Sequence, residues 1–115
     1  MIQNKTTNIS LILLTKNESQ NIEKNFDWLK KCHAVNEIVV VDDYSTDETV
    51  ATVKKLSSKY RKVKAFTKKL EQDFASQRNF AISKTTNNWI LWVDADEKPS
   101  KKLIRFINHF DKKQY

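Results

Sequence analysis

Four aspartates stand in two short clusters, each directly after an apolar run: Asp42 beside Asp43, and Asp94 with Asp96. If both runs are buried strands of one parallel sheet, the clusters lie along one carboxyl edge, where open α/β sheets bind ligands. Crowded carboxylates repel one another and raise each other's pKa, so a cation or a ligand is the natural reason for such clusters. Hard divalent cations such as Mg²⁺ or Mn²⁺ take oxygen ligands. The sequence therefore predicts a ligand site with Asp94 and Asp96 as the metal-binding pair; a turn with two solvated aspartates is the alternative.

The segment after the first apolar run is also polar, and it falls at the same predicted edge. Thr15 can hydrogen-bond a ligand, and Lys16 can pair with a phosphate or lay its stem on a base. Asn17 and Glu18 fit two explanations equally well, either the entry of a helix or contacts with a ligand. We count all four residues among the candidates.

The loop after the second apolar run leads into a predicted helix. Ser45 and Glu48 have the spacing of a capping box, in which the two side chains satisfy free amides of the first helical turn. Asp42 and Asp43 precede that box and are harder to explain as caps. One of them is therefore expected to accept hydrogen bonds from a base or a ribose.

Arg78 is the central residue of the segment Gln77-Arg78-Asn79, which falls in a predicted helix. Its neighbours there are neutral, so the guanidinium can lean toward the acidic edge. It is either a structural counter-ion of the carboxylates or a contact to a ligand.

Four apolar runs predict strands, at residues 9–14, 37–41, 62–66 and 89–93. The first, second and fourth are nearly continuous, as is typical of strands covered on both faces. Apolar residues at helical spacing follow each run, starting after Ser19, after Ser45, near Phe74 and after Ser100. This alternation predicts a parallel sheet with right-handed crossovers. Exposed edges of that sheet could pair between copies of the chain to form a homo-oligomer.

The composition bounds the class of protein. The 115 residues, 39% of them hydrophobic, suffice for one domain over residues 1–115 and are too few for two cores. The polar ends, residues 1–7 and 111–115, are expected to fray. The single cysteine, Cys32, excludes an internal disulfide and suits a reducing compartment. No run approaches the roughly 18 apolar residues that span a bilayer, and no secretory segment is visible, so we expect a cytoplasmic protein.

The net charge of +7 is unevenly distributed along the chain. The segment Lys54–Lys69 holds eight Lys or Arg residues and no acidic residue. The plain explanation is a solvated surface. The alternative is attraction to phosphates or to the anionic inner face of a membrane, where each nearby basic residue contributes about 1 kcal/mol. Nucleic acid is not expected as a partner, because no basic helix or aromatic platform of a known binding module is visible.

Four segments together resemble family 2 glycosyltransferases with the GT-A fold. They are residues 9–18 (ISLILLTKNE), 37–47 (EIVVVDDYSTD), 77–81 (QRNFA) and 89–97 (WILWVDADE). The form with Gln77-Arg78-Asn79 is most similar to enzymes that add sugars to lipopolysaccharide cores or other envelope glycans. The resemblance implies an α/β fold: a three-layer α/β/α sandwich with a mainly parallel, Rossmann-like (GT-A) sheet, here truncated.

The resemblance further implies that a nucleotide-diphospho-sugar donor binds along the carboxyl edge. Asp94 and Asp96 would hold Mg²⁺ or Mn²⁺ at the pyrophosphate, and the metal would neutralise the leaving nucleoside diphosphate as a Lewis acid. Arg78 would lie near the base or the phosphates. Transfer would invert the anomeric centre in a single displacement. The predicted donor-binding set is Thr15, Lys16, Asn17, Glu18, Asp42, Asp43, Arg78 and Asp94.

The chain departs from the family pattern at Tyr44, where glycine is usual, and at Lys16, where an aromatic residue is frequent. A catalytic base must reach the acceptor proton, and no candidate for it is present after Asp96, so binding without efficient transfer is expected. Two alternatives remain. One is a donor-binding remnant or module that docks on a membrane or a larger transferase. The other, more remote, is a phosphoacceptor receiver domain, which carries its acidic pair after the first strand rather than the second.

Overall fold

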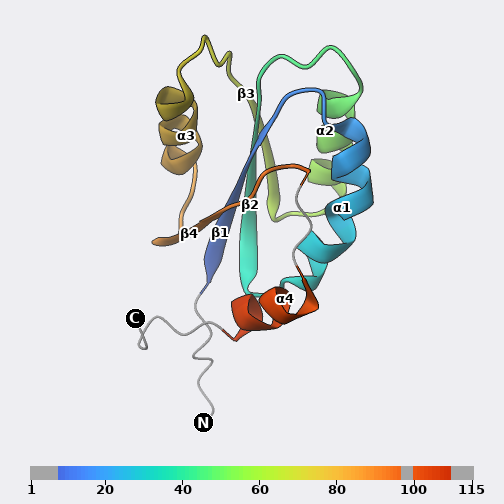
Figure 1. Cartoon of the computed structure of the whole chain (residues 1–115), viewed down its shortest axis with the longest axis vertical. Helices are drawn as coiled ribbons and strands as arrows, with labels where there is room; N and C mark the ends of the chain where they lie inside the picture. The colour runs from blue at the N-terminus through green and yellow to red at the C-terminus, as the bar shows by residue number, and fades with distance from the viewer. Residues whose placement is uncertain (1–7, 97–99, 110–115) are drawn as a thin grey trace.

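The computed structural model describes residues 8–96 and 100–109, and the ends expected to fray, 1–7 and 111–115, lie outside this part of the chain. Strands and helices alternate through it (Figure 1). The strands are β1 (Ile9–Thr15), β2 (Val35–Asp42), β3 (Val63–Thr67) and β4 (Trp89–Trp92). The helices are α1 (Ser19–Lys31), α2 (Thr49–Lys59), α3 (Phe74–Ser83) and α4 (Lys101–Asn108).

The described strands form one sheet in the order β3-β2-β1-β4, and each neighbouring pair is parallel. The parallel α/β arrangement predicted from the sequence is confirmed. Thr15, Asp42 and Thr67 stand side by side where β1, β2 and β3 end. β4 stops earlier, since its last residue Trp92 pairs with Ile12. The polar loops after β1 and β2 therefore meet at one edge of the sheet.

Helices cover both faces of the sheet, which gives the predicted three layers (Figure 1). On one face α3 packs against β1 and β2 through a small cluster of Ile12, Val39, Val41 and Ala81. On the other face α1, α2 and α4 contribute to a larger cluster, with Ile22, Phe26, Val53 and Ile107 among its members. Successive side chains of a strand point to opposite faces, so β1 and β2 must be apolar along their length when both faces are buried. Each such side chain contributes roughly 1.5–3 kcal/mol on full burial.

The strand β4 is more exposed than its apolar sequence predicts. Coverage on both faces was expected, but 38% of Trp89, 37% of Ile90 and 41% of Trp92 is exposed to solvent. The expectation is wrong for a topological reason, because β4 lies at the edge of the sheet with β1 as its neighbour. The helices α2 and α3 pack over the other three strands.

Helix α2 begins at Thr49, later than the predicted capping box of Ser45 and Glu48. Glu48 occupies the N-cap position, and its side chain makes no capping hydrogen bond. The predicted box is wrong because Ser45 has another partner: its amide and its hydroxyl both donate to the Asp42 carboxylate. The predicted start of α4 is confirmed, since the Ser100 side chain caps that helix.

The chain has no glycine, so residues with side chains occupy the left-handed backbone region in its turns. In residues 8–96 and 100–109, φ is positive at Asn17 (54°), Tyr44 (44°), Glu71 (51°) and Gln72 (63°). Asparagine tolerates this region better than most residues do. For Tyr44 the conformation costs roughly 1–2 kcal/mol. Tyr44 stands at the position where the resemblance leads us to expect glycine, which would avoid that cost.

Candidate functional site

Asp42 is a buried hydrogen-bond acceptor at the carboxyl edge of the sheet. Its carboxylate is 3% exposed and accepts a hydrogen bond from the Thr15 hydroxyl at 2.7 Å. It also accepts bonds from the Ser45 amide at 2.7 Å and the Ser45 hydroxyl at 2.6 Å. These donors occupy both carboxylate oxygens. Asp42 therefore fixes the loop after β2 against the end of β1.

The loops after β1 and β2 brace each other through Asn17 and Lys16. The Asn17 carbonyl oxygen accepts bonds from the Thr46 amide at 2.8 Å and the Asp47 amide at 3.3 Å. The Lys16 ammonium donates to the backbone carbonyl of Asp43 at 2.8 Å. Such bonds between loops fix the backbone that any ligand at this edge would meet. The side chain of Asn17 is thus committed to the loop.

Asp47 joins the start of α1 to the start of α2. Its carboxylate accepts bonds from the Thr49 amide at 2.8 Å, from the Thr49 hydroxyl, and from the Ser19 hydroxyl at 3.1 Å. The Thr49 hydroxyl lowers the pKa of the Asp47 carboxyl below its ordinary value, and the Thr49 amide and Ser19 add to this effect. Glu18 lies beside this junction, where its carboxylate accepts a bond from the Asn21 amide group at 2.6 Å.

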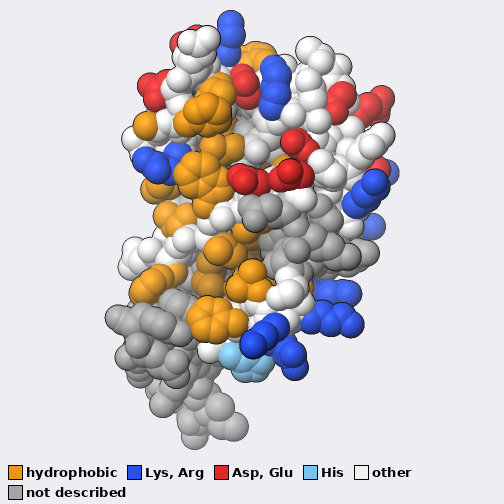
Figure 2. Space-filling view, viewed as in Figure 1, with side chains coloured by type: hydrophobic (Ala, Val, Ile, Leu, Met, Phe, Trp, Pro, Cys, Tyr) orange, Lys and Arg blue, Asp and Glu red, His pale blue; other side chains and the backbone are white. Residues whose placement is uncertain are grey.

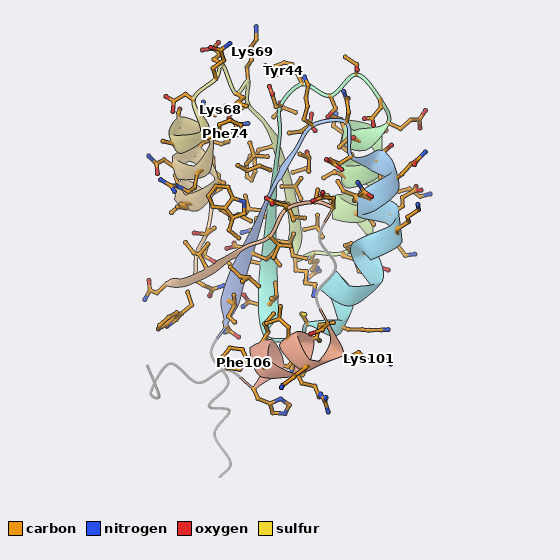
Figure 3. All side chains as sticks on the ribbon, in the orientation of Figure 1. Tyr44, Lys68, Lys69, Phe74, Lys101 and Phe106 are labelled. Carbon is orange, nitrogen blue, oxygen red and sulfur yellow. The ribbon has the colours of Figure 1, made fainter. Side chains whose placement is uncertain are left out.

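A hollow of about 160 Å³ opens between the ends of β1 and β2, the loop after β3 and the first turn of α3. Four residues predicted from the sequence line it together: Thr15, Lys16, Glu18 and Asp43. The remaining lining residues are Leu14 of β1, then Leu70, Phe74 and Gln77 from later in the chain. Figure 3 shows Phe74 on the side of α3 and Tyr44, Lys68 and Lys69 above it at the same end of the sheet. The predicted convergence of the loops after β1 and β2 is thus realised as a lined depression.

Asp43 faces this hollow with a partly satisfied carboxylate. One oxygen accepts a hydrogen bond from the Leu70 amide at 3.0 Å, which ties the loop after β3 to the loop after β2. The side chain is half-buried. Asp43 differs in this respect from Asp42, whose carboxylate serves the loop alone.

Gln77 is a lining residue that the sequence did not single out as a candidate. Its side chain is 2% exposed, and its amide nitrogen donates to the backbone carbonyl of Lys68 at 2.6 Å. The carbonyl oxygen Oε1 is buried without a hydrogen-bond partner in the described part of the chain. The signal in the sequence was present, because Gln77 precedes Arg78 in the third matching segment.

Asp94 and Asp96 lie in the loop that follows β4. Both are exposed, whereas Ala95 between them is 8% exposed and belongs to the larger hydrophobic cluster. The buried methyl group holds the loop on the sheet while the two carboxylates face outward. Figure 2 shows acidic side chains gathered near the centre of one face, where Figure 1 shows the segment after β4.

The carboxylates of this loop fit a hard divalent cation whose coordination shell is completed by other ligands. In the described residues no group of three or more His, Cys, Asp or Glu side chains could hold a metal ion. The two aspartate pairs therefore do not form one four-carboxylate cluster there. Mg²⁺ and similar ions are commonly held by one or two carboxylates, with phosphate oxygens and water as the other ligands. Asp94 and Asp96 supply carboxylates of that kind.

Arg78 lies outside the lining of the hollow. It is exposed, and its guanidinium carbon Cζ lies 5.7 Å from the centroid of the Trp92 ring. The contact joins α3 to the end of β4, just before Asp94. Arg78 thus stands on the side of the site that leads to the aspartate loop.

Most basic side chains of the segment Lys54–Lys69 lie at the surface of the protein. Lys64 forms an ion pair with the buried carboxylate of Glu37, and Lys68 donates to the Ser76 hydroxyl at 3.1 Å. The other basic side chains of the segment are exposed or half-buried around α2 and β3. None of the described helices has the length and hydropathy that crossing a bilayer requires.

A family model described as "Glycosyl transferase family 2" matches residues 10–115 of the chain. An uncharacterised glycosyltransferase of Rickettsia conorii is 37% identical over 103 residues, which cover 90% of this chain and 34% of the relative. The lipopolysaccharide core biosynthesis glycosyltransferase LpsC of Rhizobium meliloti is 30% identical over 99 residues, 86% of this chain and 35% of the relative. The chain spans about a third of the length of these curated relatives.

Solved structures agree with these matches. The mannosyltransferase PcManGT from Pyrobaculum calidifontis, in complex with GDP-Man and Mn²⁺, has a TM-score of 0.70 and 24% identity with this chain. The match covers 88% of this chain and 31% of that one. At this identity the likeness shows the fold, and the Rossmann-like (GT-A) sheet is confirmed. The receiver-domain alternative is overturned by the family match.

Proposed function

The chain belongs to glycosyltransferase family 2, and we propose that it binds a nucleotide-diphospho-sugar donor together with a divalent cation. The observation that carries this proposal is the hollow at the carboxyl ends of β1 and β2, which Thr15, Lys16, Glu18 and Asp43 line together. Open parallel sheets bind their ligands at that position. These four residues all belong to the set predicted from the sequence, whereas Phe74, a contact proposed below, does not.

The nucleoside end of the donor is assigned to the hollow. Asp43 is a better contact for it than Asp42, because the Asp42 carboxylate is occupied by Thr15 and Ser45. Asn17 supports the loops instead of touching the donor, since Thr46 and Asp47 occupy its carbonyl oxygen. A ring of the size of a nucleobase can lie against Phe74, whose side chain is 66% exposed at the rim.

The diphosphate end is assigned to the loop after β4. Asp94 and Asp96 would hold Mg²⁺ or Mn²⁺, and the ion would supply charge neutralisation for the diphosphate that leaves. Arg78 adds a guanidinium on this side of the site, and guanidinium groups bind phosphate oxygens in a bidentate manner. The complex of PcManGT with GDP-Man and Mn²⁺ supports a donor and an ion of this kind.

For the whole reaction we propose sugar transfer to an envelope glycan or lipid, with inversion at the anomeric carbon. The 30% identity to LpsC supports an acceptor of this class. The catalytic base remains unassigned, because no described residue beyond the aspartate loop fits that role. A cytoplasmic location at the inner face of the membrane agrees with the exposed basic residues of Lys54–Lys69. If the chain binds its donor without transferring the sugar, it acts as a donor-binding module that docks on a larger transferase.

Calorimetric titration with UDP-sugars and GDP-sugars, with and without Mn²⁺, tests the proposal. We expect binding that requires the ion and falls at least about tenfold in Asp96→Ala, because a ligand of the cation is removed. Glu23→Gln is the control, since Glu23 is an exposed carboxylate on α1 that belongs neither to the lining of the hollow nor to the proposed metal pair. Silence with every nucleotide sugar would contradict the proposal and favour a non-binding remnant.

A further inference from the structure

Gln77 lines the hollow, and its buried side chain carries an unsatisfied hydrogen-bond acceptor. Its amide nitrogen is committed to the Lys68 carbonyl at 2.6 Å, which fixes the orientation of the carboxamide. A flipped amide would set two carbonyl oxygens against each other. The oxygen Oε1 is therefore the end left without a partner in the described structure. A buried acceptor in this state destabilises the fold until a donor reaches it.

Three of the other four polar side chains around the hollow are acceptors as well. The Thr15 hydroxyl donates its hydrogen bond to Asp42, so toward a ligand its oxygen can only accept a bond. Asp43 and Glu18 present carboxylates, and each is bonded to one described donor. Lys16 is the cation of the set, and its ammonium is held by the backbone carbonyls of Asp43 and Tyr44. A ligand that fits this wall must bring hydrogen-bond donors.

We propose that Gln77 selects the base of the donor, with Oε1 accepting a hydrogen bond from a ring N–H of uracil or guanine. This inference rests on the proposed function. Uracil and guanine carry a protonated ring nitrogen on the edge used for pairing, whereas cytosine and adenine present a bare nitrogen there. A bare nitrogen would face the Gln77 oxygen with a lone pair. Cytosine and adenine can offer Oε1 only an exocyclic amino group on that edge, so a contact at the ring nitrogen favours a uridine or guanosine diphosphate sugar.

Phe74 supplies the other half of the base site. It lies one helical turn before Gln77 on α3, lines the same hollow and is 66% exposed. Residues three apart on a helix lie on one face, so a base against the Phe74 ring has an edge toward Gln77. Oε1 is closed to solvent, so the base reaches it only when a lining side chain such as the exposed Phe74 ring turns aside.

The test is calorimetric titration of the whole chain with UDP, GDP, CDP and ADP in the presence of Mn²⁺. We expect UDP or GDP to bind about tenfold more tightly than CDP and ADP, the factor that one net hydrogen bond supplies. In Gln77→Met this preference should fall to about twofold, while the dependence on Mn²⁺ persists. In Asn88→Ala, which removes an exposed amide before β4 at the far end of the sheet, the preference should remain.

The outcomes separate this inference from the proposed function. If the wild-type chain binds none of the four nucleotides, the proposed function fails. If it binds them and CDP or ADP binds best, the role of Gln77 is overturned while donor binding stands. That role is overturned in the same way if Gln77→Met keeps the tenfold preference. If Gln77→Met does not fold, N3-methyl-UDP is titrated against the wild-type chain instead. The proposed role of Gln77 then predicts that N3-methyl-UDP binds no more tightly than CDP, and tighter binding overturns that role.

Discussion

The guanidinium carbon of Arg78 lies 5.7 Å from the centroid of the Trp92 ring, so that α3 and the edge strand β4 are joined beside the aspartate loop. A cation–π contact at an exposed site contributes about 0.5–1 kcal/mol. The contact orients the arginine more than it stabilises the fold. It directs a permanent positive charge toward the side of the site where the diphosphate is expected.

Replacing Arg78 therefore separates charge from geometry. Arg78→Ala should weaken binding of the nucleotide sugar about tenfold or more, because a phosphate contact is lost. Arg78→Lys keeps the charge without the planar fork and should recover only part of that loss. Titration calorimetry measures both, and urea unfolding should show that neither variant loses more than about 1 kcal/mol of stability. Equal affinity of the wild type and Arg78→Ala would assign Arg78 to packing on Trp92 alone.

The buried carboxylate of Glu37 should make stability depend on acid. Burial raises its pKa, but hydrogen bonds from Lys64, Ser10 and Thr86 outweigh that effect and lower the pKa to about 2. A group with a lowered pKa stabilises the fold above its unfolded pKa, and this stability is lost as the pH falls toward the folded pKa. The loss should amount to about 2–3 kcal/mol between pH 4.5 and 2, after allowance for the screening of the partly exposed Lys64.

Urea unfolding between pH 7 and pH 2 measures this contribution. Glu37→Gln should be less stable than the wild type at pH 7, and the difference should shrink as the acid protonates the wild-type carboxyl. The exposed carboxylate variant Glu23→Gln serves as the control and should keep the wild-type acid profile. A constant difference between Glu37→Gln and the wild type down to pH 2 would show that the carboxylate charge is not the source of the stability.

Tyr44 should be a site at which glycine stabilises the chain. Its φ of 44° costs roughly 1–2 kcal/mol with a side chain present, and glycine removes this cost. Part of the resulting gain in stability is lost again, because glycine has more conformational freedom in the unfolded chain. Tyr44→Gly is expected to raise the free energy of unfolding by about 0.5–1 kcal/mol. Tyr44→Ala keeps the Cβ atom and should bring no gain. Denaturant unfolding distinguishes the two, and equal stability of both variants would argue against backbone strain.

Thr15 should stabilise the fold through its hydroxyl proton. Thr15→Val keeps the shape but leaves the 3% exposed carboxylate of Asp42 without one of its donors. The expected cost is about 1–3 kcal/mol of unfolding free energy. Thr15→Ser retains the donor and should lose less. If Thr15→Val unfolds at the same denaturant concentration as the wild type, the bond to Asp42 has no net effect.

The order of strands and helices was predictable from the sequence because the central strands are buried on both faces. The continuous apolar runs of β1 and β2 follow directly from that burial. The same pattern misled at β4, since an apolar run does not reveal whether a strand is central or at an edge. Trp89 and Trp92 are apolar and yet partly exposed for that reason.

Within the candidate site, residue types near strand ends were predictable and their partners were not. Thr15, Lys16, Glu18 and Asp43 meet at the hollow because parallel strands end at one edge. Asp42 fixes the loop and Asp43 faces the hollow because Ser45 donates to the Asp42 carboxylate. The spacing of the residues in the sequence does not determine which of the two carboxylates Ser45 reaches. Gln77 was missed because its significance lies in an unpaired atom, which becomes visible only when Lys68 is placed beside it.

The most direct measurement is a two-dimensional amide NMR spectrum of the chain with its nucleotide sugar, recorded first with Mg²⁺ and then with Mn²⁺. If one donor molecule spans the hollow and the aspartate loop, the amide signals of Thr15 and Asp43 should shift when the nucleotide sugar binds with Mg²⁺. Paramagnetic broadening centred on Ala95 is also expected when Mn²⁺ replaces Mg²⁺. Broadening centred on Asp47 and Glu48, with the signals of Thr15 and Ala95 unchanged, would contradict donor binding at this edge of the sheet.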